Sequence, residues 1–66
     1  MQIKVNGKPK VIAAETSIMT LLQQLQLKTE HVVVEHNSGI VAKESYAKTL
    51  LAEGDALEIV QFVGGG

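Results

Sequence analysis

Residues 18–27 have the apolar spacing of an amphipathic helix, and strand-like patterns lie on both sides of this stretch. The apolar residues recur at the i, i+3, i+4 and i+7 positions that line one helix face, namely Ile18, Leu21, Leu22 and Leu25. We expect a hydroxyl of Thr16 or Ser17 to cap the helix, which should end near Leu27 or Lys28. A lone helix of this kind must bury its apolar face, so the rest of the chain has to form a sheet beneath it.

The segments around the helix have the composition and alternation of β-strands. The expected strands are residues 2–5, about 8–13, 32–34, 40–41 and 56–63. Asn6-Gly7 predicts a type I′ hairpin turn between the first two strands, and Pro9 places the second at an edge of the sheet. A second turn is expected at Asn37-Ser38-Gly39. Residues 44–53 are less regular: Ser45 should cap a short helical turn through Tyr46 and Ala47, and Leu50 or Leu51 should return to the core.

This order of elements predicts an α+β fold in a single domain, residues 1–63. The helix between the second and third strands must cover one face of the sheet and leave the other open. If the first and last strands are central neighbours, the sheet is mixed and those two strands run parallel. This is the β-grasp arrangement, a mixed sheet covered on one face by one main helix.

Composition excludes several classes of function. The 66 residues contain no cysteine, so disulfides, thiolate nucleophiles and cysteine metal sites are ruled out. The net charge of −1 gives no basic surface for nucleic acid or membrane, and no apolar run approaches the ~20 residues of a membrane span. His31 and His36 should point to opposite faces of a strand, so we interpret them as surface residues and predict no metal site. We expect a cytoplasmic protein without a signal peptide.

The final strand passes directly into three glycines, Gly64, Gly65 and Gly66. Side-chain-free residues gain nothing from packing and lose the most backbone freedom when ordered, so residues 64–66 are expected to form a flexible tail. Such a thread can enter a narrow channel in another protein and present the terminal carboxylate there. Val60, Phe62 and Val63 are the expected docking patch for that protein, because Val60 and Phe62 are apolar on the outward face of the last strand.

Four stretches of this sequence resemble the ThiS family of ubiquitin-like sulfur carriers in thiamin thiazole synthesis. They are Val5-Asn6-Gly7-Lys8, Val32-Val33-Val34-Glu35, Glu53-Gly54-Asp55 and the terminal residues 58–66. The resemblance implies that a ThiF-like adenylyltransferase uses ATP and Mg²⁺ to activate the carboxylate of Gly66. A persulfide enzyme would then supply sulfur to form a thiocarboxylate, and thiazole synthase ThiG would accept that sulfur. By the same resemblance, Gly65 leaves the approach to Gly66 unobstructed, and the chain binds no cofactor and is a co-substrate rather than an enzyme.

Three other functions remain open. A MoaD-like subunit of molybdopterin synthase shares the terminal diglycine, although prolines usually precede it and the only proline here is Pro9. A β-grasp interaction module would carry the glycines incidentally. A protein modifier would be conjugated to lysine through the same terminus.

Overall fold

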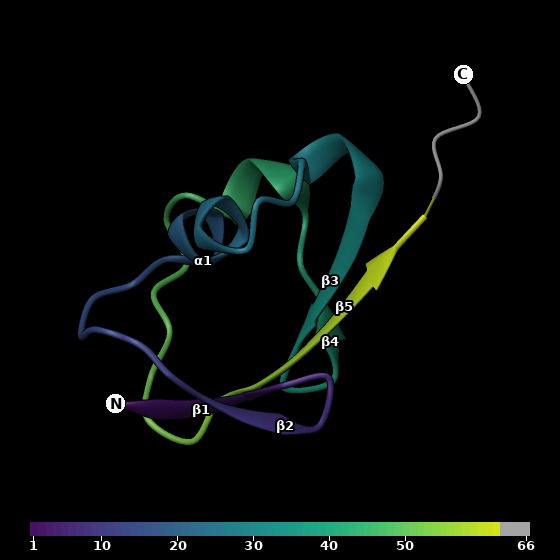
Figure 1. The fold of residues 1–66 in the computed structure, drawn as a ribbon. Coiled ribbons are helices and arrows are strands. Elements are labelled where there is room, and N and C mark those ends of the chain that lie inside the picture. The colour runs from purple at the N-terminus through teal and green to yellow at the C-terminus, as the bar shows by residue number, and fades with distance from the viewer. Residues whose placement is uncertain (63–66) are drawn as a thin grey trace.

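The computed structural model describes residues 1–62, and its strands form one five-stranded mixed sheet (Figure 1). The strands are β1 (Gln2–Val5), β2 (Lys8–Val11), β3 (Val32–His36), β4 (Gly39–Ile40) and β5 (Ala56–Gln61). The helices are α1 (Ile18–Gln24) and two 3₁₀ turns, η1 (Thr29–His31) and η2 (Lys43–Ser45). The sheet order is β2-β1-β5-β3-β4; β1 and β5 are parallel, and the other pairs are antiparallel. The predicted β-grasp topology is therefore confirmed.

The first hairpin has the predicted turn. Asn6 and Gly7 both have positive φ angles, 52° and 81°, as a type I′ turn requires, and Val5 is the partner of Lys8 across it. Pro9 lies on β2, an edge strand, so its missing amide costs no hydrogen bond within the sheet. The strand ends at Val11, two residues before the expected Ala13.

Helix α1 begins as predicted and ends early. Ser17 is the cap, and its Oγ accepts a hydrogen bond from the Thr20 amide at 3.0 Å. The predicted end near Leu27 or Lys28 is wrong, because Gln26 adopts a left-handed φ of 60°. The Gln26 amide donates to the Gln23 carbonyl at 3.0 Å and the Leu27 amide to the Leu22 carbonyl at 2.9 Å. This pair of bonds is a Schellman motif, which terminates a helix.

The core lies between α1 and one face of the sheet. Its fully buried members come from the helix, the strands and the segment before β5, and the largest are Tyr46, Ile3, Ile18, Leu21, Leu22, Leu57, Val32 and Val34. Burial of each aliphatic side chain contributes about 1.5–3 kcal/mol. No helix within residues 1–62 covers the opposite face of the sheet (Figure 1).

The chain between β3 and β5 departs most from expectation. The β3–β4 turn is a two-residue turn, Asn37-Ser38, because His36 pairs with Gly39, so Gly39 belongs to β4 rather than to the turn. Ser45 ends η2 instead of capping a turn after it, and its carbonyl accepts from the Thr49 amide. Tyr46, expected only as part of a short helical turn, is a core residue and is 1% exposed. Leu51 is the leucine that returns to the core, whereas Leu50 is 55% exposed.

Candidate functional site

Strand β5 is the last strand before the three glycines, and it lies between β1 and β3 in the sheet. Its first residues, Ala56 and Leu57, pair with β1, whereas residues 57–61 pair with β3. The C-terminal half of β5 therefore has β3 as its only strand partner within residues 1–62, and Figure 1 shows it leading away from the β1–β2 hairpin. The predicted tail, Gly64–Gly66, and the predicted docking residue Val63 lie outside the described residues.

Two asparagines from hairpin turns hold β5 near its ends. Asn6 Oδ1 accepts from the Ile59 amide at 2.7 Å, and Asn6 Nδ2 donates to the Ile59 carbonyl at 3.2 Å. At the other end, Asn37 Oδ1 accepts from the Ala56 amide at 2.9 Å, and the Asn37 amide donates to the Ala56 carbonyl at 2.8 Å. Strand β1 ends at Val5, and beyond this point the Asn6 side chain, instead of a strand, forms hydrogen bonds to the backbone of β5. These bonds hold β5 in position past the two residues that pair with β1.

Exposed apolar side chains lie near the end of β5 and directly after it. The strand ends at Gln61, so Phe62, which was expected within it, follows the strand. Val60 is 56% exposed and Phe62 is 43% exposed, so the structure leaves both of these predicted docking residues available. Val33 of β3 is the direct partner of Val60 and is 39% exposed. Opposed residues of an antiparallel pair share a face, so Val33 extends the patch sideways. We call Val33, Val60 and Phe62 the sheet patch.

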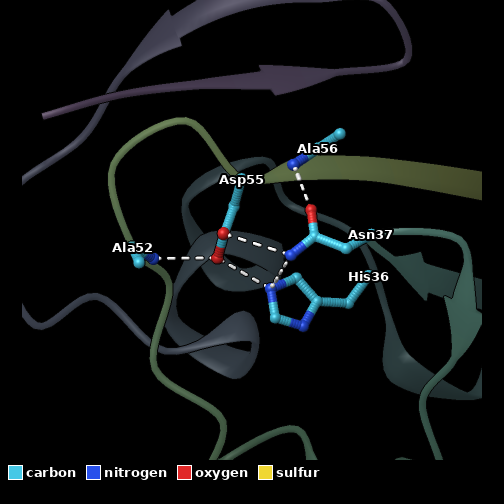
Figure 2. Close-up of polar contacts among 5 residues, drawn as sticks. All are labelled: His36, Asn37, Ala52, Asp55 and Ala56. Carbon is cyan, nitrogen blue, oxygen red and sulfur yellow. Dashed lines mark hydrogen bonds and ion pairs between the residues drawn. The ribbon is translucent and has the colours of Figure 1, made fainter.

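A polar cluster ties the β3–β4 turn to the segment that enters β5 (Figure 2). His36 Nε2 lies 2.7 Å from Asp55 Oδ2, and Asn37 Nδ2 donates to Asp55 Oδ1 at 3.2 Å. The Ala52 amide also donates to Asp55 Oδ2, at 2.8 Å. Each oxygen of this carboxylate is therefore hydrogen-bonded, and the cluster joins segments that are far apart in sequence.

The surroundings of Asp55 shift its pKa. Burial raises the pKa of this carboxyl, but the hydrogen bonds from His36, the Ala52 amide and Asn37 favour the ionised form and together bring it below its ordinary value of 3.8. His31 is exposed as expected, although it lies in η1 rather than on a strand. His36, interpreted as a surface residue, is half-buried: its side chain is 23% exposed and contacts Asp55.

Residues 1–62 hold neither a cluster of metal ligands nor a membrane-spanning helix. This part of the chain contains no group of three or more His, Asp or Glu side chains placed to hold a metal ion. None of its helices is long and apolar enough to cross a membrane.

The sequence did not predict that Val33 belongs to the exposed apolar patch, nor that the side chains of Asn6 and Asn37 bond to the backbone of β5. Val33 stands in an unbroken valine run, which hides the alternation between the two faces of β3. Asn6 was identified only as a turn residue, because its contact with Ile59 spans 53 positions of the sequence. The alternation of β5 was the one local signal that located Val60 and Phe62.

Three comparisons with known proteins match this chain to ThiS proteins over all or nearly all of its length. Residues 3–66 match the ThiS family. The sulfur carrier protein ThiS of Bacillus subtilis (strain 168) is 42% identical over 65 residues, which cover 97% of this chain and 98% of that protein. The crystal structure of the thiamine biosynthesis protein ThiS from Geobacter metallireducens has a TM-score of 0.85 and 36% identity, covering 100% of both chains.

A thiazole synthase contains a similar region. The protein from Paramagnetospirillum magneticum (strain ATCC 700264 / AMB-1) is 41% identical over 66 residues, which is 100% of this chain but 20% of that protein. This chain thus spans about a fifth of the length of that relative. Because the family match extends over residues 3–66 and the Bacillus relative is matched over nearly its entire length, the chain belongs to the ThiS family.

Proposed function

We propose that this protein is a sulfur carrier for thiamin thiazole synthesis and that Gly66 carries the sulfur. A ThiF-like adenylyltransferase joins the Gly66 carboxylate to AMP from ATP with Mg²⁺, releasing pyrophosphate. The terminal sulfur of a persulfide enzyme then attacks the adenylate and displaces AMP, which gives an acyl disulfide. A thiol reduces this disulfide, becoming part of a new disulfide itself, and releases the thiocarboxylate that thiazole synthase ThiG consumes. The observation that carries this proposal is the family match over residues 3–66, a range that includes Gly64-Gly65-Gly66.

Activation must precede sulfur entry because a carboxylate is a poor acyl donor. The acyl adenylate is readily hydrolysed, so it has to form in a partner site that excludes water. An extended segment of four residues reaches about 13 Å, which allows residues 63–66 to enter such a site while the folded domain stays outside. The chain is then a co-substrate that brings no bound cofactor, and ATP places the reaction in the cytoplasm.

The sheet patch supports this proposal by offering exposed apolar contact area near the end of β5. Val60 and Phe62, together with Val63, form the proposed docking patch, and Val33 widens it. A thiazole synthase that contains a region similar to this chain supports ThiG as the accepting partner.

Intact-mass spectrometry after incubation with ThiF, ATP, Mg²⁺ and a persulfide donor tests the proposal. We expect the mass to rise by the difference between sulfur and oxygen, and only when ATP is present. Because the chain has no cysteine, iodoacetamide should then alkylate only the new thiocarboxylate, and fragmentation should place the label on Gly66. An unchanged mass with an active partner enzyme would refute the carrier function, and an isopeptide to lysine would instead indicate a modifier.

A further inference from the structure

The first hairpin turn has the sequence Asn6-Gly7, which is chemically reactive as well as suited to the turn. In an Asn-Gly pair the backbone nitrogen of the glycine attacks the side-chain carbonyl carbon of the asparagine. Gly7 has no side chain to hinder this attack, and apart from its chain neighbours no heavy atom lies within 4 Å of where its Cβ would be. Asn6 is exposed, so water reaches the two reacting groups.

The fold holds the Asn6 side chain in an orientation that does not serve this reaction. Asn6 Oδ1 accepts from the Ile59 amide at 2.7 Å, and Asn6 Nδ2 donates to the Ile59 carbonyl at 3.2 Å. Two bonds to the backbone of one residue fix the plane of the carboxamide against β5. The attack of the Gly7 nitrogen needs access to the face of that group, and Nδ2 is the atom that leaves. The reaction therefore requires Asn6 to separate from Ile59.

We propose that Asn6 is a deamidation site whose reaction with Gly7 is controlled by the contact between Asn6 and Ile59. When β5 separates from Asn6, the Gly7 nitrogen bonds to Asn6 Cγ and the bond from Cγ to Nδ2 breaks. The proton of the Gly7 amide leaves with Nδ2 as ammonia. Water then opens the succinimide ring and returns a proton to the Gly7 nitrogen. Cleavage at Cγ gives aspartate, and cleavage at the backbone carbonyl carbon gives isoaspartate.

Neither product restores the contact with β5. Both replace the donor Nδ2 by a carboxylate oxygen, which would face the Ile59 carbonyl oxygen and repel it. Isoaspartate also adds a methylene group to the backbone of a two-residue turn in which Asn6 and Gly7 have φ angles of 52° and 81°. Deamidation thus makes the separation of β5 from Asn6 permanent, and this chemistry is independent of what Gly66 carries.

The second turn supplies an internal comparison. The side chain of Asn37 is also held, because its Oδ1 accepts from the Ala56 amide at 2.9 Å and its Nδ2 donates to Asp55 Oδ1 at 3.2 Å. The residue after it is Ser38, whose side chain stands beside the attacking nitrogen. In the unfolded chain, where neither asparagine is held, we therefore expect Asn37 to react more slowly than Asn6.

Incubation of the full chain in heavy-oxygen water tests the proposal, with one sample folded and another unfolded in guanidinium chloride at the same mildly alkaline pH and temperature. Peptide mapping should find the oxygen label in aspartate and isoaspartate at position 6. We expect the reaction at Asn6 to be at least about tenfold slower in the folded chain, since two hydrogen bonds must break first. The control Asn6→Gln should acquire no label there, because the longer side chain closes the corresponding larger ring far more slowly.

Equal rates in the folded and unfolded samples would overturn control by the contact with Ile59. An unlabelled Asn6 in guanidinium chloride, or an Asn37 that reacts as fast as Asn6 there, would overturn the site itself. The isoaspartyl form, separated by ion exchange and refolded, should melt below both the wild type and Asn6→Asp, which has the same charge and an unchanged backbone. If it melts with the wild type, the contact does not depend on the side-chain amide and the proposal is wrong.

Discussion

Replacement of Asn6 by glycine should loosen β5 without disturbing the hairpin turn. Glycine accepts the φ of 52° that Asn6 adopts, so the turn retains its conformation. The substitution removes the bonds of 2.7 Å and 3.2 Å between the Asn6 side chain and the backbone of Ile59. The effect should therefore be confined to β5 beyond the point where β1 ends.

The expected loss of stability follows from these two bonds. Each contributes about 0.5–1.5 kcal/mol net, and water can reach part of this exposed site, so we expect Asn6→Gly to cost about 1–2 kcal/mol. For a domain of this size, that cost lowers the melting temperature by roughly 5–15 °C. Because β5 leads to the tail, the variant should also be adenylated with a higher KM under the proposed function.

Thermal unfolding followed by far-ultraviolet circular dichroism measures the global effect, and amide hydrogen exchange locates it. The Ile59 amide should exchange faster in Asn6→Gly, whereas the Leu57 amide should change only by the global loss of stability. Asn6→Asp is the matched control, since it keeps the acceptor to Ile59 and loses the donor, and it should be intermediate. Equal protection of Ile59 in Asn6→Gly and the wild type would refute the role assigned to Asn6.

Three further predictions concern the second turn, the polar cluster and the sheet patch. Ser38→Gly should stabilise the fold by about 0.5–1 kcal/mol, because Ser38 has a φ of 76°; a lower melting temperature would contradict this. The folded pKa of Asp55 lies below its ordinary value of 3.8, so its ionised form stabilises the fold above that value, and this contribution is lost as the pH falls through the lower, folded pKa. Urea titrations should therefore show Asp55→Asn less stable than the wild type at neutral pH, with the difference shrinking below pH 3.8; a constant difference would count against this linkage. Phe62→Ala should raise the KM for adenylation and leave the fold intact, whereas Val11→Ala, at a 78% exposed residue of β2, should leave KM unchanged; unfolding of Phe62→Ala would instead place Phe62 in the core.

Local patterns were sufficient for much of the fold. The type I′ turn at Asn6-Gly7, the edge position of Pro9 and the Ser17 cap each depend on the conformational preferences of one or two residues. The buried helix face at Ile18, Leu21 and Leu22 follows from helical periodicity. The alternation of β5 likewise predicted that Val60 and Phe62 face away from the core.

Tertiary structure decided the features that depend on which segments meet. The helix ends at Gln24 because Gln26 takes a left-handed conformation, for which glutamine is not a typical residue. Tyr46 is buried because its irregular segment packs against α1, where the Met19 amide donates to the Tyr46 carbonyl. No local preference of either segment specifies that contact.

The features of the candidate site also fall into those that local sequence predicts and those that depend on tertiary contacts. The sequence by itself determined the run of three glycines, the absence of cysteine and the apolar outward residues of the last strand, because these are matters of composition and period. Only the tertiary structure decided that Val33 lies opposite Val60, that Glu35 lies opposite Glu58, and that Asn6 bonds to Ile59. The physical reason is that strand register is set by packing and hydrogen bonding between distant segments, and a shift of one residue would turn each of these side chains to the other face.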